Sequence, residues 1–213
     1  LAPESIAPAV HDVLRGVRTR VLVFSPDSAR LYYAVGEQLL RWDVQAREAV
    51  GQPVEVPGGA VTALAVNRKG DRIVAGTESG AVALIDANNG RVLGSADEHG
   101  DPVTALAVSP ADNFYASGSD DEEVHVYHLR TGAHAFELAD VGEEVTTVRF
   151  GADGKTLVVA SRDRMVRLYD VNLQKELRAF KESAKRLLFA ELSRDGAWLA
   201  IAAKRVDIDL RRN

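Results

Sequence analysis

The chain has 213 residues, of which 46% are hydrophobic and 27% charged, and its formal net charge is −5. This composition predicts a packed core, gives no indication of nucleic-acid binding, and includes no apolar run of the ~18–20 residues that a membrane helix needs. The absence of cysteine excludes disulfides, thiolate zinc sites and a cysteine nucleophile, and it fits a cytoplasmic location.

The predicted elements begin with a candidate strand, "AVHDVLRG", within residues 1–17. Five similar units come next, each with an apolar run, a turn-like segment and further apolar runs. In the third unit these are "TALAV", "SPADNF", "FYASG" and "VHVYHL", and a more polar run, "AHAFEL", ends the unit. Short runs separated by Pro, Asp, Asn and Gly predict an antiparallel meander of strands. The units cover residues 18–57, 58–99, 100–141, 142–183 and 184–213.

The units keep one period along the chain, since the hexapeptide "VTALAV" occupies Val61–Val66 and again Val103–Val108. Four short strands per ~40–45 residues is the period of propeller blades. The sequence therefore predicts an all-β fold, a β-propeller of four-stranded antiparallel blades, with about five repeats in a single domain over residues 1–213. Residues 1–17 are the candidate outer strand of the closing blade.

The first strand of each unit is predicted to lie innermost, near the propeller axis. Both faces of "VTALAV" are apolar, which fits a strand covered by a sheet on each side, and its alanines suit the place where blades converge. An apolar residue ends this strand in all five units, and we expect these residues to be buried at equivalent positions between blades. They are Phe24, Val66, Val108, Phe150 and Leu192.

The units resemble WD-repeat β-propellers. The resemblance rests on "AVSPADNFYASGSDDEEVHVYHL" and "VRFGADGKTLVVASRDRMVRLYDV", which contain a turn, a strand of small residues and an outer strand that ends in an aromatic residue and Asp. Trp42–Asp43 is a literal Trp-Asp pair and Tyr169–Asp170 a conservative version. The resemblance covers residue 18 to the C-terminus. A composition rich in arginine, alanine and valine adds the expectation of a bacterial source.

The resemblance implies a buried structural network of His, Ser, Asp and an aromatic residue. Its positions are filled only in the third unit, by His99, Ser117, Asp121 and Tyr127. The fourth unit keeps Asp163 but has Val141 at the histidine position. Such networks satisfy buried polar groups, and we favour this interpretation over a catalytic His–Asp pair.

The sequence contains no pattern that indicates catalysis. His125 and His128 lie three apart on one predicted strand, so they should point to opposite faces and not share a metal. No His/Asp/Glu cluster has the spacing of metal ligands. The acidic stretch Ser117–Glu123 lacks the alternation of a calcium loop and is expected to be a solvated turn. We therefore expect no metal, no cofactor and no enzyme activity.

A pair of opposite charges interrupts the apolar frame. The position of Ala65 and Ala107 is held by Arg149 in the fourth unit and by Glu191 in the fifth. Equivalent positions in adjacent blades lie at equal height, so we expect these two residues to form a buried ion pair, because a buried charge is tolerated only when paired. The alternative is that each side chain reaches channel water independently.

By resemblance, one face of such a propeller binds a protein partner. Carried onto this sequence, the face is flanked in each unit by residues of the first strand and of the turn after the second strand. The basic members belong to units four, five and one, and the acidic members to units two and three with Glu144 at the border, which predicts a polarised face. The predicted face comprises Arg18, Arg20, Thr62, Glu78, Thr104, Asp120, Glu144, Thr146, Arg162, Arg186 and Lys204.

The resemblance implies a non-enzymatic scaffold or docking module, the sensor or docking part of a larger bacterial signalling protein. Its partner is a protein of unknown identity or other domains of a longer parent chain, with no nucleic acid and no membrane. The alternative is a propeller enzyme or small-ligand sensor that uses the central channel. Two closures remain open, five blades alone or five-sevenths of a seven-bladed ring.

Overall fold

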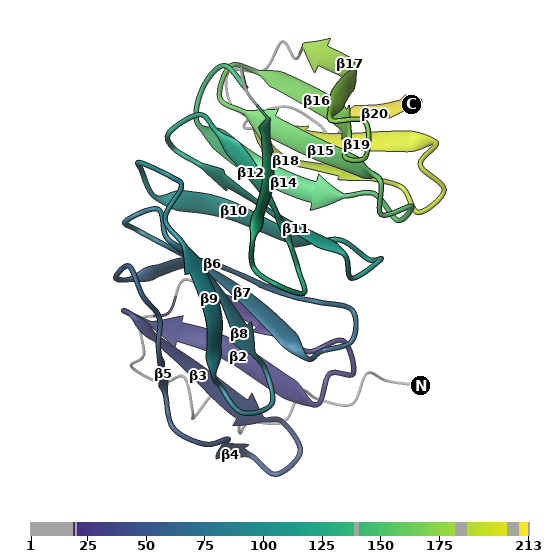
Figure 1. The fold of residues 1–213 in the computed structure, drawn as a ribbon. Coiled ribbons are helices and arrows are strands. Elements are labelled where there is room, and N and C mark those ends of the chain that lie inside the picture. The colour runs from purple at the N-terminus through teal and green to yellow at the C-terminus, as the bar shows by residue number, and fades with distance from the viewer. Residues whose placement is uncertain (1–18, 20, 139–140, 182–186, 204–208, 213) are drawn as a thin grey trace, which may run out of the picture.

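The computed structural model describes residues 19, 21–138, 141–181, 187–203 and 209–212. All regular structure in these residues is β, and the strands form five separate antiparallel sheets in chain order. Figure 1 shows the sheets following one another from the purple first sheet to the yellow fifth sheet. The all-β prediction is thus confirmed, as are the four-stranded antiparallel units in the three central sheets, whereas a closed propeller is not shown.

The three central sheets each have four strands in simple sequential order. The second sheet contains β6 (Val61–Val66), β7 (Arg72–Thr77), β8 (Val82–Asp86) and β9 (Val92–Ala96). The third contains β10 (Val103–Val108), β11 (Phe114–Ser119), β12 (Val124–His128) and β13 (His134–Leu138). The fourth contains β14 (Val145–Phe150), β15 (Thr156–Ser161), β16 (Met165–Asp170) and β17 (Lys175–Lys181).

The first and fifth sheets depart from the predicted four strands. The first sheet has five strands, because the polar outer segment is split into two short pieces that both pair with β3. These strands are β1 (Leu22–Phe24), β2 (Arg30–Val35), β3 (Gln38–Asp43), β4 (Glu48–Ala49) and β5 (Val54–Glu55). The fifth sheet has three described strands, β18 (Leu187–Leu192), β19 (Trp198–Ala203) and β20 (Asp209–Arg212). The candidate strand within residues 1–17 lies outside the described residues.

The turn between the first two strands of a sheet is closed by a side chain rather than by the backbone alone. In the first sheet Asp27 accepts hydrogen bonds from the Ser25 hydroxyl and from the amide of Ala29. In the fifth sheet Asp195 does the same for Ser193 and Ala197. Short polar side chains that bond to nearby amides favour such turns, which explains why this segment is recognisable in the sequence.

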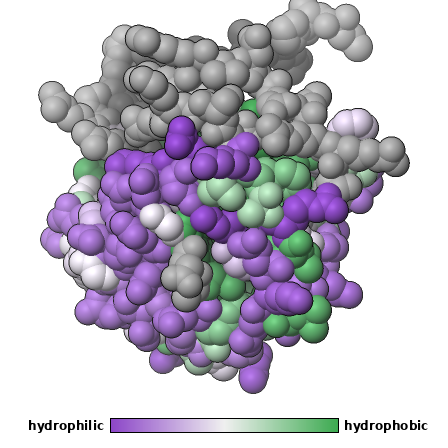
Figure 2. All heavy atoms as spheres, turned by 90° about the horizontal axis from the view of Figure 1, so that it is seen from above, coloured by the Kyte–Doolittle hydropathy of each residue, from purple (hydrophilic) through white to green (hydrophobic). Residues whose placement is uncertain are grey.

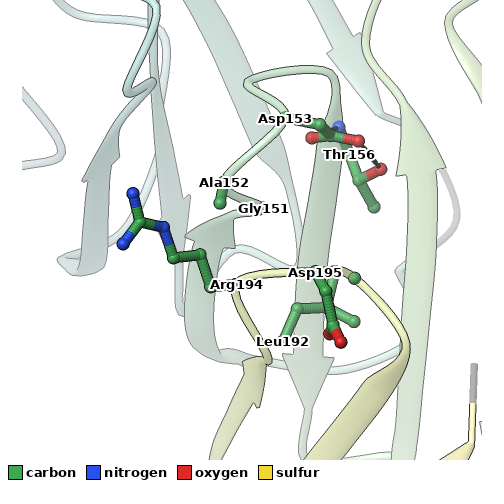
Figure 3. Close-up of a pocket in the computed structure, with 8 residues that line it drawn as sticks. Gly151, Ala152, Asp153, Thr156, Leu192, Arg194 and Asp195 are labelled. Carbon is green, nitrogen blue, oxygen red and sulfur yellow. Dashed lines mark hydrogen bonds between the residues drawn. The ribbon is translucent and has the colours of Figure 1, made fainter.

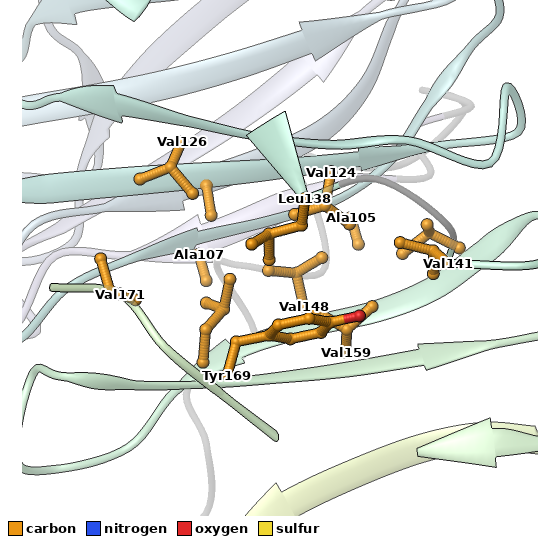
Figure 4. Close-up of a cluster of buried hydrophobic side chains, with 13 residues drawn as sticks. Ala105, Ala107, Val124, Val126, Leu138, Val141, Val148, Val159, Tyr169 and Val171 are labelled. Carbon is orange, nitrogen blue, oxygen red and sulfur yellow. The ribbon is translucent and has the colours of Figure 1, made fainter. Parts of the chain in front are cut away.

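Neighbouring sheets pack through their first two strands, and the cores lie between the sheets. Contacts join β6 to β10, β10 to β14 and β14 to β18. The core between the third and fourth sheets is shown in Figure 4, where Ala105 and Ala107 of β10 lie close to Val148, Val159 and Tyr169 of the fourth sheet. The small alanines allow this approach, as the sequence predicted for an innermost strand.

The five residues that end the first strands are not equally buried, so the prediction of equivalent buried positions is wrong. Leu192 is 9% exposed, whereas Phe24 is 49% exposed. The cause is position in the series of sheets. In β1, Val23 packs against the core shared with the second sheet, and Phe24, one residue later, points to the opposite face of the strand. The described residues place no further sheet against that face. Val66, Val108 and Phe150 are partly buried.

Candidate interaction face, central cavity and buried networks

A cavity of about 570 Å³ opens where the first three sheets meet at one end of their inner strands. Four residues of the predicted partner-binding face line it, namely Thr62, Glu78, Thr104 and Asp120. The lining also includes Gly36 and Pro102, which belong to the same two kinds of position. The structure therefore brings these residues together from three sheets. Whether they bind a partner stays a prediction.

Backbone hydrogen bonds hold the residues of this face in pairs across each sheet. The Glu78 amide donates to the Ala60 carbonyl at 2.9 Å, and the Asp120 amide donates to the Pro102 carbonyl at 3.1 Å. The fourth sheet repeats the pairing, since the Arg162 amide donates to the Glu144 carbonyl at 2.9 Å. Each turn after a second strand is thus fixed to the loop before the first strand.

The threonines of the face form hydrogen bonds within the sheets. A bulge interrupts the pairing of the first two strands in each of the three central sheets. At this point the hydroxyl oxygens of Thr62, Thr104 and Thr146 each lie 3.1 Å from a carbonyl oxygen of the second strand, to which Thr62 and Thr146 donate. The Thr104 hydroxyl also lies 2.6 Å from the carbonyl of Val145 in the next sheet. These hydroxyls therefore stabilise the bulge. The charged side chains at the cavity rim are those of the acidic residues.

The acidic residues Glu78 and Asp120 of the face lie on the second and third sheets, where the sequence placed them, but the basic charge of the fourth sheet is paired. Arg162 and Glu144 form an ion pair with 2.7 Å between Nη1 and Oε1, so these two charges largely cancel. Glu78 is exposed and Asp120 partly buried at the cavity rim. The predicted basic residues Arg18, Arg20, Arg186 and Lys204 lie outside the described residues. The described rim of the cavity is therefore acidic.

A second cavity, of about 350 Å³, lies between the first strands of all five sheets. Residues from β1, β6, β10, β14 and β18 line it, which places these strands innermost. Arg149 lines the cavity, and its Nε lies 3.6 Å from Glu191 Oε2. Arg149 also lies over the ring of Phe189, 5.3 Å from its centroid. The predicted pairing of the two charges is confirmed, but the expectation that the pair is buried is wrong, because the two side chains are 40% and 47% exposed to solvent.

The third sheet contains the hydrogen-bond network that the resemblance implies. His99 Nδ1 lies 2.9 Å from Asp121 Oδ2, and His99 Nε2 lies 2.7 Å from the Ser117 hydroxyl. The tight turn at Gly80 allows this placement. Gly80 has a φ of +94°, and a Cβ there would collide with the carbonyl of His99, so only glycine fits.

Electrostatics favour a neutral His99 and an ionised Asp121. Burial lowers the pKa of His99, and the neighbouring His125 lowers it further, against the attraction of Asp121. Burial raises the pKa of Asp121, but hydrogen bonds from the Glu123 and Gly100 amides and from His99 bring that pKa below its usual value. An ionised Asp121 accepts from His99 Nδ1–H, which leaves Nε2 of the neutral ring as an acceptor.

Tyr127 differs from the role that the resemblance implies. Its ring stacks on Tyr115 with 4.8 Å between centroids, but its buried hydroxyl makes no hydrogen bond of ordinary geometry. Burial raises the pKa of Tyr127, and the nearby Ser117 hydroxyl partly opposes this shift. Tyr127 therefore completes the network by packing rather than by donating a hydrogen bond.

The fourth sheet has a different polar network, which sequence reasoning missed. Arg167 Nη2 lies 2.6 Å from Asp163 Oδ2, and Ser161 donates to the same carboxylate and lies 3.0 Å from the carbonyl of Val141. Asp163 and Arg167 are only 16% and 12% exposed. In the fourth sheet, Arg167 on a strand is the partner of the aspartate. In the third sheet, His99 in a loop has that role. The signal in the sequence was Asp163, which the fourth unit keeps although Val141 stands at the histidine position.

A further cavity, of about 460 Å³, lies between turns of the fourth and fifth sheets (Figure 3). Figure 3 shows Asp153 and Asp195 on separate turns, with Arg194 pointing away from Asp153. Both carboxylates accept hydrogen bonds from their own turns, Asp153 from the amides of Lys155 and Thr156. These acids are occupied by turn structure and carry no evident chemistry.

Three histidines of the third sheet lie together, although the sequence indicated no cluster. His125 Nδ1 lies 3.0 Å from His134 Nε2, and the rings of His99 and His125 have centroids 4.5 Å apart. Glu123 approaches His125 Nε2 at 3.0 Å. The residues come from a loop and two strands, so their sequence spacing matches no ligand motif. His128, as expected, lies on the other face and is exposed.

Comparison with known proteins supports one class of repeat. Residues 106–193 match the model of the anaphase-promoting complex subunit 4 WD40 domain. The matches support the WD40-repeat family. WD repeat-containing protein SL1-17 of Schistosoma mansoni is 32% identical over 117 residues, 54% of this chain and 38% of that protein.

Two further relatives have similar identity to this chain and similar coverage. Eukaryotic translation initiation factor 3 subunit I of Neurospora crassa is 28% identical over 106 residues, 50% of this chain and 30% of that protein. An uncharacterized WD repeat-containing protein of Synechocystis is 30% identical over 113 residues, 53% of this chain and 32% of that protein. This chain spans well under half of each relative. Two of the three are eukaryotic, so these relatives do not support the expected bacterial source.

Within the described residues, no helix has the length and apolar character needed to cross a bilayer. Figure 2 views the molecule from the end that carries β17 and β20 in Figure 1, and hydrophilic residues cover most of the described surface there, with hydrophobic areas between them. Trp198 and Phe189 of the fifth sheet are 48% and 38% exposed. The described part of the fifth sheet therefore presents apolar side chains to solvent.

Proposed function

We propose that this chain is a non-enzymatic docking module of the WD40 type, which binds a protein partner at the cavity between its first three sheets. The observation that carries the proposal is the lining of this cavity. Glu78 and Asp120 come from different sheets, and backbone hydrogen bonds hold both turns in place. A preorganised rim of this kind lowers the entropic cost of binding.

The acidic rim defines the chemistry of the partner. Because Arg162 is neutralised by Glu144, the charges that remain at the described rim are those of Glu78 and Asp120. A loop that carries lysine or arginine would complement them, and opposite charges speed encounter as well as fixing register. The same rim repels phosphate groups, which argues against nucleic acid as the ligand.

The comparisons support the docking role through the names of the related proteins. The matching family model and one relative are named as subunits, of the anaphase-promoting complex and of a translation initiation factor. Our proposal extends to a cytoplasmic location, to a position within a longer parent chain with a signalling role, and to packing of the five sheets as propeller blades. Closure of the ring, by five or by seven blades, belongs to the same proposal.

The central cavity supports the alternative of a channel enzyme less well. Its lining, as far as the structure describes it, is mainly Thr, Ala, Val and Leu with Arg149 as the charged member. Acid–base catalysis needs a titratable group positioned at the reacting atoms. Glu191, the nearest carboxylate to Arg149 in the described ion pairs, is engaged by that arginine.

Site-specific photo-crosslinking tests the docking face. A photoreactive amino acid is placed at Ala60, which lines the cavity, and in a matched variant at Leu173, which is 70% exposed and lies in the turn after β16. The proposal predicts that the Ala60 variant captures one specific protein from extracts and that the Leu173 variant does not. Capture of the same protein at equal yield from Leu173, or from neither site, would contradict it.

A further inference from the structure

The side chains of His99, Glu123 and His125 converge in the third sheet. One ring nitrogen of each histidine and one carboxylate oxygen of Glu123 lie within 4.8 Å of one another. Two imidazole nitrogens and one carboxylate oxygen are the ligand set of many three-ligand zinc sites, whose fourth position is open. From this geometry we propose that His99, Glu123 and His125 bind one divalent transition-metal ion of the zinc type.

Each histidine is already oriented by a second group at its Nδ1 atom. His99 Nδ1 is 2.9 Å from Asp121 Oδ2, and His125 Nδ1 is 3.0 Å from His134 Nε2. Histidines that bind metals almost always donate their other N–H to such a partner, which fixes the ring and raises its basicity. The Nε2 atoms are therefore the metal ligands, and Asp121 and His134 are positioning residues.

Without metal, other bonds occupy the coordinating atoms. His99 Nε2 faces the Ser117 hydroxyl at 2.7 Å, and His125 Nε2 faces Glu123 Oε2 at 3.0 Å. A metal replaces the first bond and takes the place of the proton in the second. The Ser117 hydroxyl then has another acceptor close by, because the buried Tyr127 hydroxyl has no hydrogen bond of ordinary geometry. The exchange therefore leaves no additional polar group without a partner.

The protons balance through the contact between His125 and His134. In the metal-free state His125 Nε2–H donates to Glu123, so its Nδ1 accepts from His134 Nε2–H. When metal binds His125 Nε2, the proton sits on Nδ1 and donates to His134 Nε2, and His134 carries its proton on Nδ1. Both rings stay neutral, and no proton is released from the pair.

The exposure of Glu123 and the sequences of the neighbouring units both favour a metal site that is specific to the third sheet. The imidazoles are 0% and 3% exposed, whereas Glu123 is 50% exposed, so an ion enters past Glu123. At the repeat position that His125 occupies, the second sheet carries Ala83 and the fourth sheet carries Arg167. The repeat frame therefore does not require a histidine here.

Isothermal titration of untagged, chelator-treated protein with zinc chloride tests the site. We expect one ion per chain for the wild type, and on the order of tenfold weaker binding or more for Glu123→Gln and His125→Asn. His134→Gln should weaken binding by about tenfold through loss of orientation. The control is His128→Asn, an exposed histidine on the other face of β12, which should bind as the wild type does. Cobalt should give the visible absorption bands of a four-coordinate ion.

Glu123→Gln keeps the test decisive, because it is a conservative change of a side chain that is 50% exposed, and circular dichroism checks that each variant is folded. The proposal is overturned if wild type binds no zinc. It is equally overturned if Glu123→Gln and His125→Asn bind as tightly as wild type, or if His128→Asn weakens binding as much as they do.

Discussion

Gly118 of β11 packs directly against Val145 of β14, so that a Cβ at Gly118 would collide with Val145 Cγ1 and lie 2.8 Å from Val148 Cγ2. Gly76 of β7 has the same relationship to Val103 of β10, one repeat earlier in the chain. The second strand of one sheet therefore provides a gap that the first residue of the next sheet fills. This contact sets the distance between neighbouring sheets and repeats with the period of the sequence.

Substitution of Gly118 by alanine should destabilise the protein by about 1–3 kcal/mol, the usual cost of overpacking a tight core. The matched control is Gly94→Ala in β9, where the nearest atom to an added Cβ is 3.9 Å away, and its effect should be close to zero. Urea unfolding followed by circular dichroism measures both. Equal effects at the two sites would show that the gap at Gly118 is not filled by Val145.

Acidification should destabilise the third sheet in a defined direction. The pKa of His99 is lowered from 6.5 and that of Asp121 from 3.8, so the folded state binds fewer protons than the unfolded state. Stability is therefore greatest above the unfolded pKa of histidine and falls as pH drops below about 6.5, with a further loss as Asp121 protonates. Urea unfolding from pH 7.5 to 5 should show this decline, and His99→Gln should flatten it. An unchanged slope in His99→Gln would contradict the assignment.

The two ion pairs of the fourth sheet should differ in their contributions. Asp163 and Arg167 are mostly buried, and removal of one partner leaves the other without compensation, so Asp163→Asn should cost about 1–3 kcal/mol. Glu144 and Arg162 are 34% and 42% exposed, and Glu144→Gln should cost at most about 1 kcal/mol. Thermal unfolding compares the two. A larger loss for Glu144→Gln would reverse this ranking of the pairs.

Arg149 and Glu191 should be weakly coupled. Because both side chains are substantially exposed, their interaction free energy in a double-mutant cycle should be about 0.2–1 kcal/mol, and it should decrease in high salt. The cycle uses Arg149→Ala, Glu191→Ala and the double variant. Additive effects at low salt would mean that each side chain interacts mainly with water or with Phe189.

The sequence was sufficient for features that repeat and insufficient for features that occur once. A constant repeat length predicted strands, turns and the inner position of "VTALAV", because every sheet buries the same kinds of residue. It failed at Phe24, whose exposure depends on which sheets pack beside the first sheet rather than on the repeat. It also failed at His134, because a contact across two strands of one sheet depends on hydrogen-bond register and not on sequence spacing. It failed at Arg167 because its contact with Asp163, in the turn before the same strand, occurs in the fourth sheet and is not part of the repeat.

The candidate face was predictable only in part for the same reason. The positions of Glu78 and Asp120 are set by the repeat, but the neutralisation of Arg162 by Glu144 depends on two side chains meeting across a sheet. An expected polarity based on charge alone could not include that pairing. The cavity itself arises from the approach of three sheets, which no single unit encodes.

The most direct test of the docking account is the affinity of the crosslinked partner for two charge-reversed variants, measured by titration calorimetry at low and high salt. One variant carries Glu78→Lys and Asp120→Lys at the rim, and the other carries Glu48→Lys and Glu137→Lys on exposed outer strands with the same change in net charge. The account predicts that the rim variant binds at least about tenfold more weakly at low salt, which corresponds to about 1.4 kcal/mol, and that the outer-strand variant binds like wild type. Equal affinities for the two variants would contradict it.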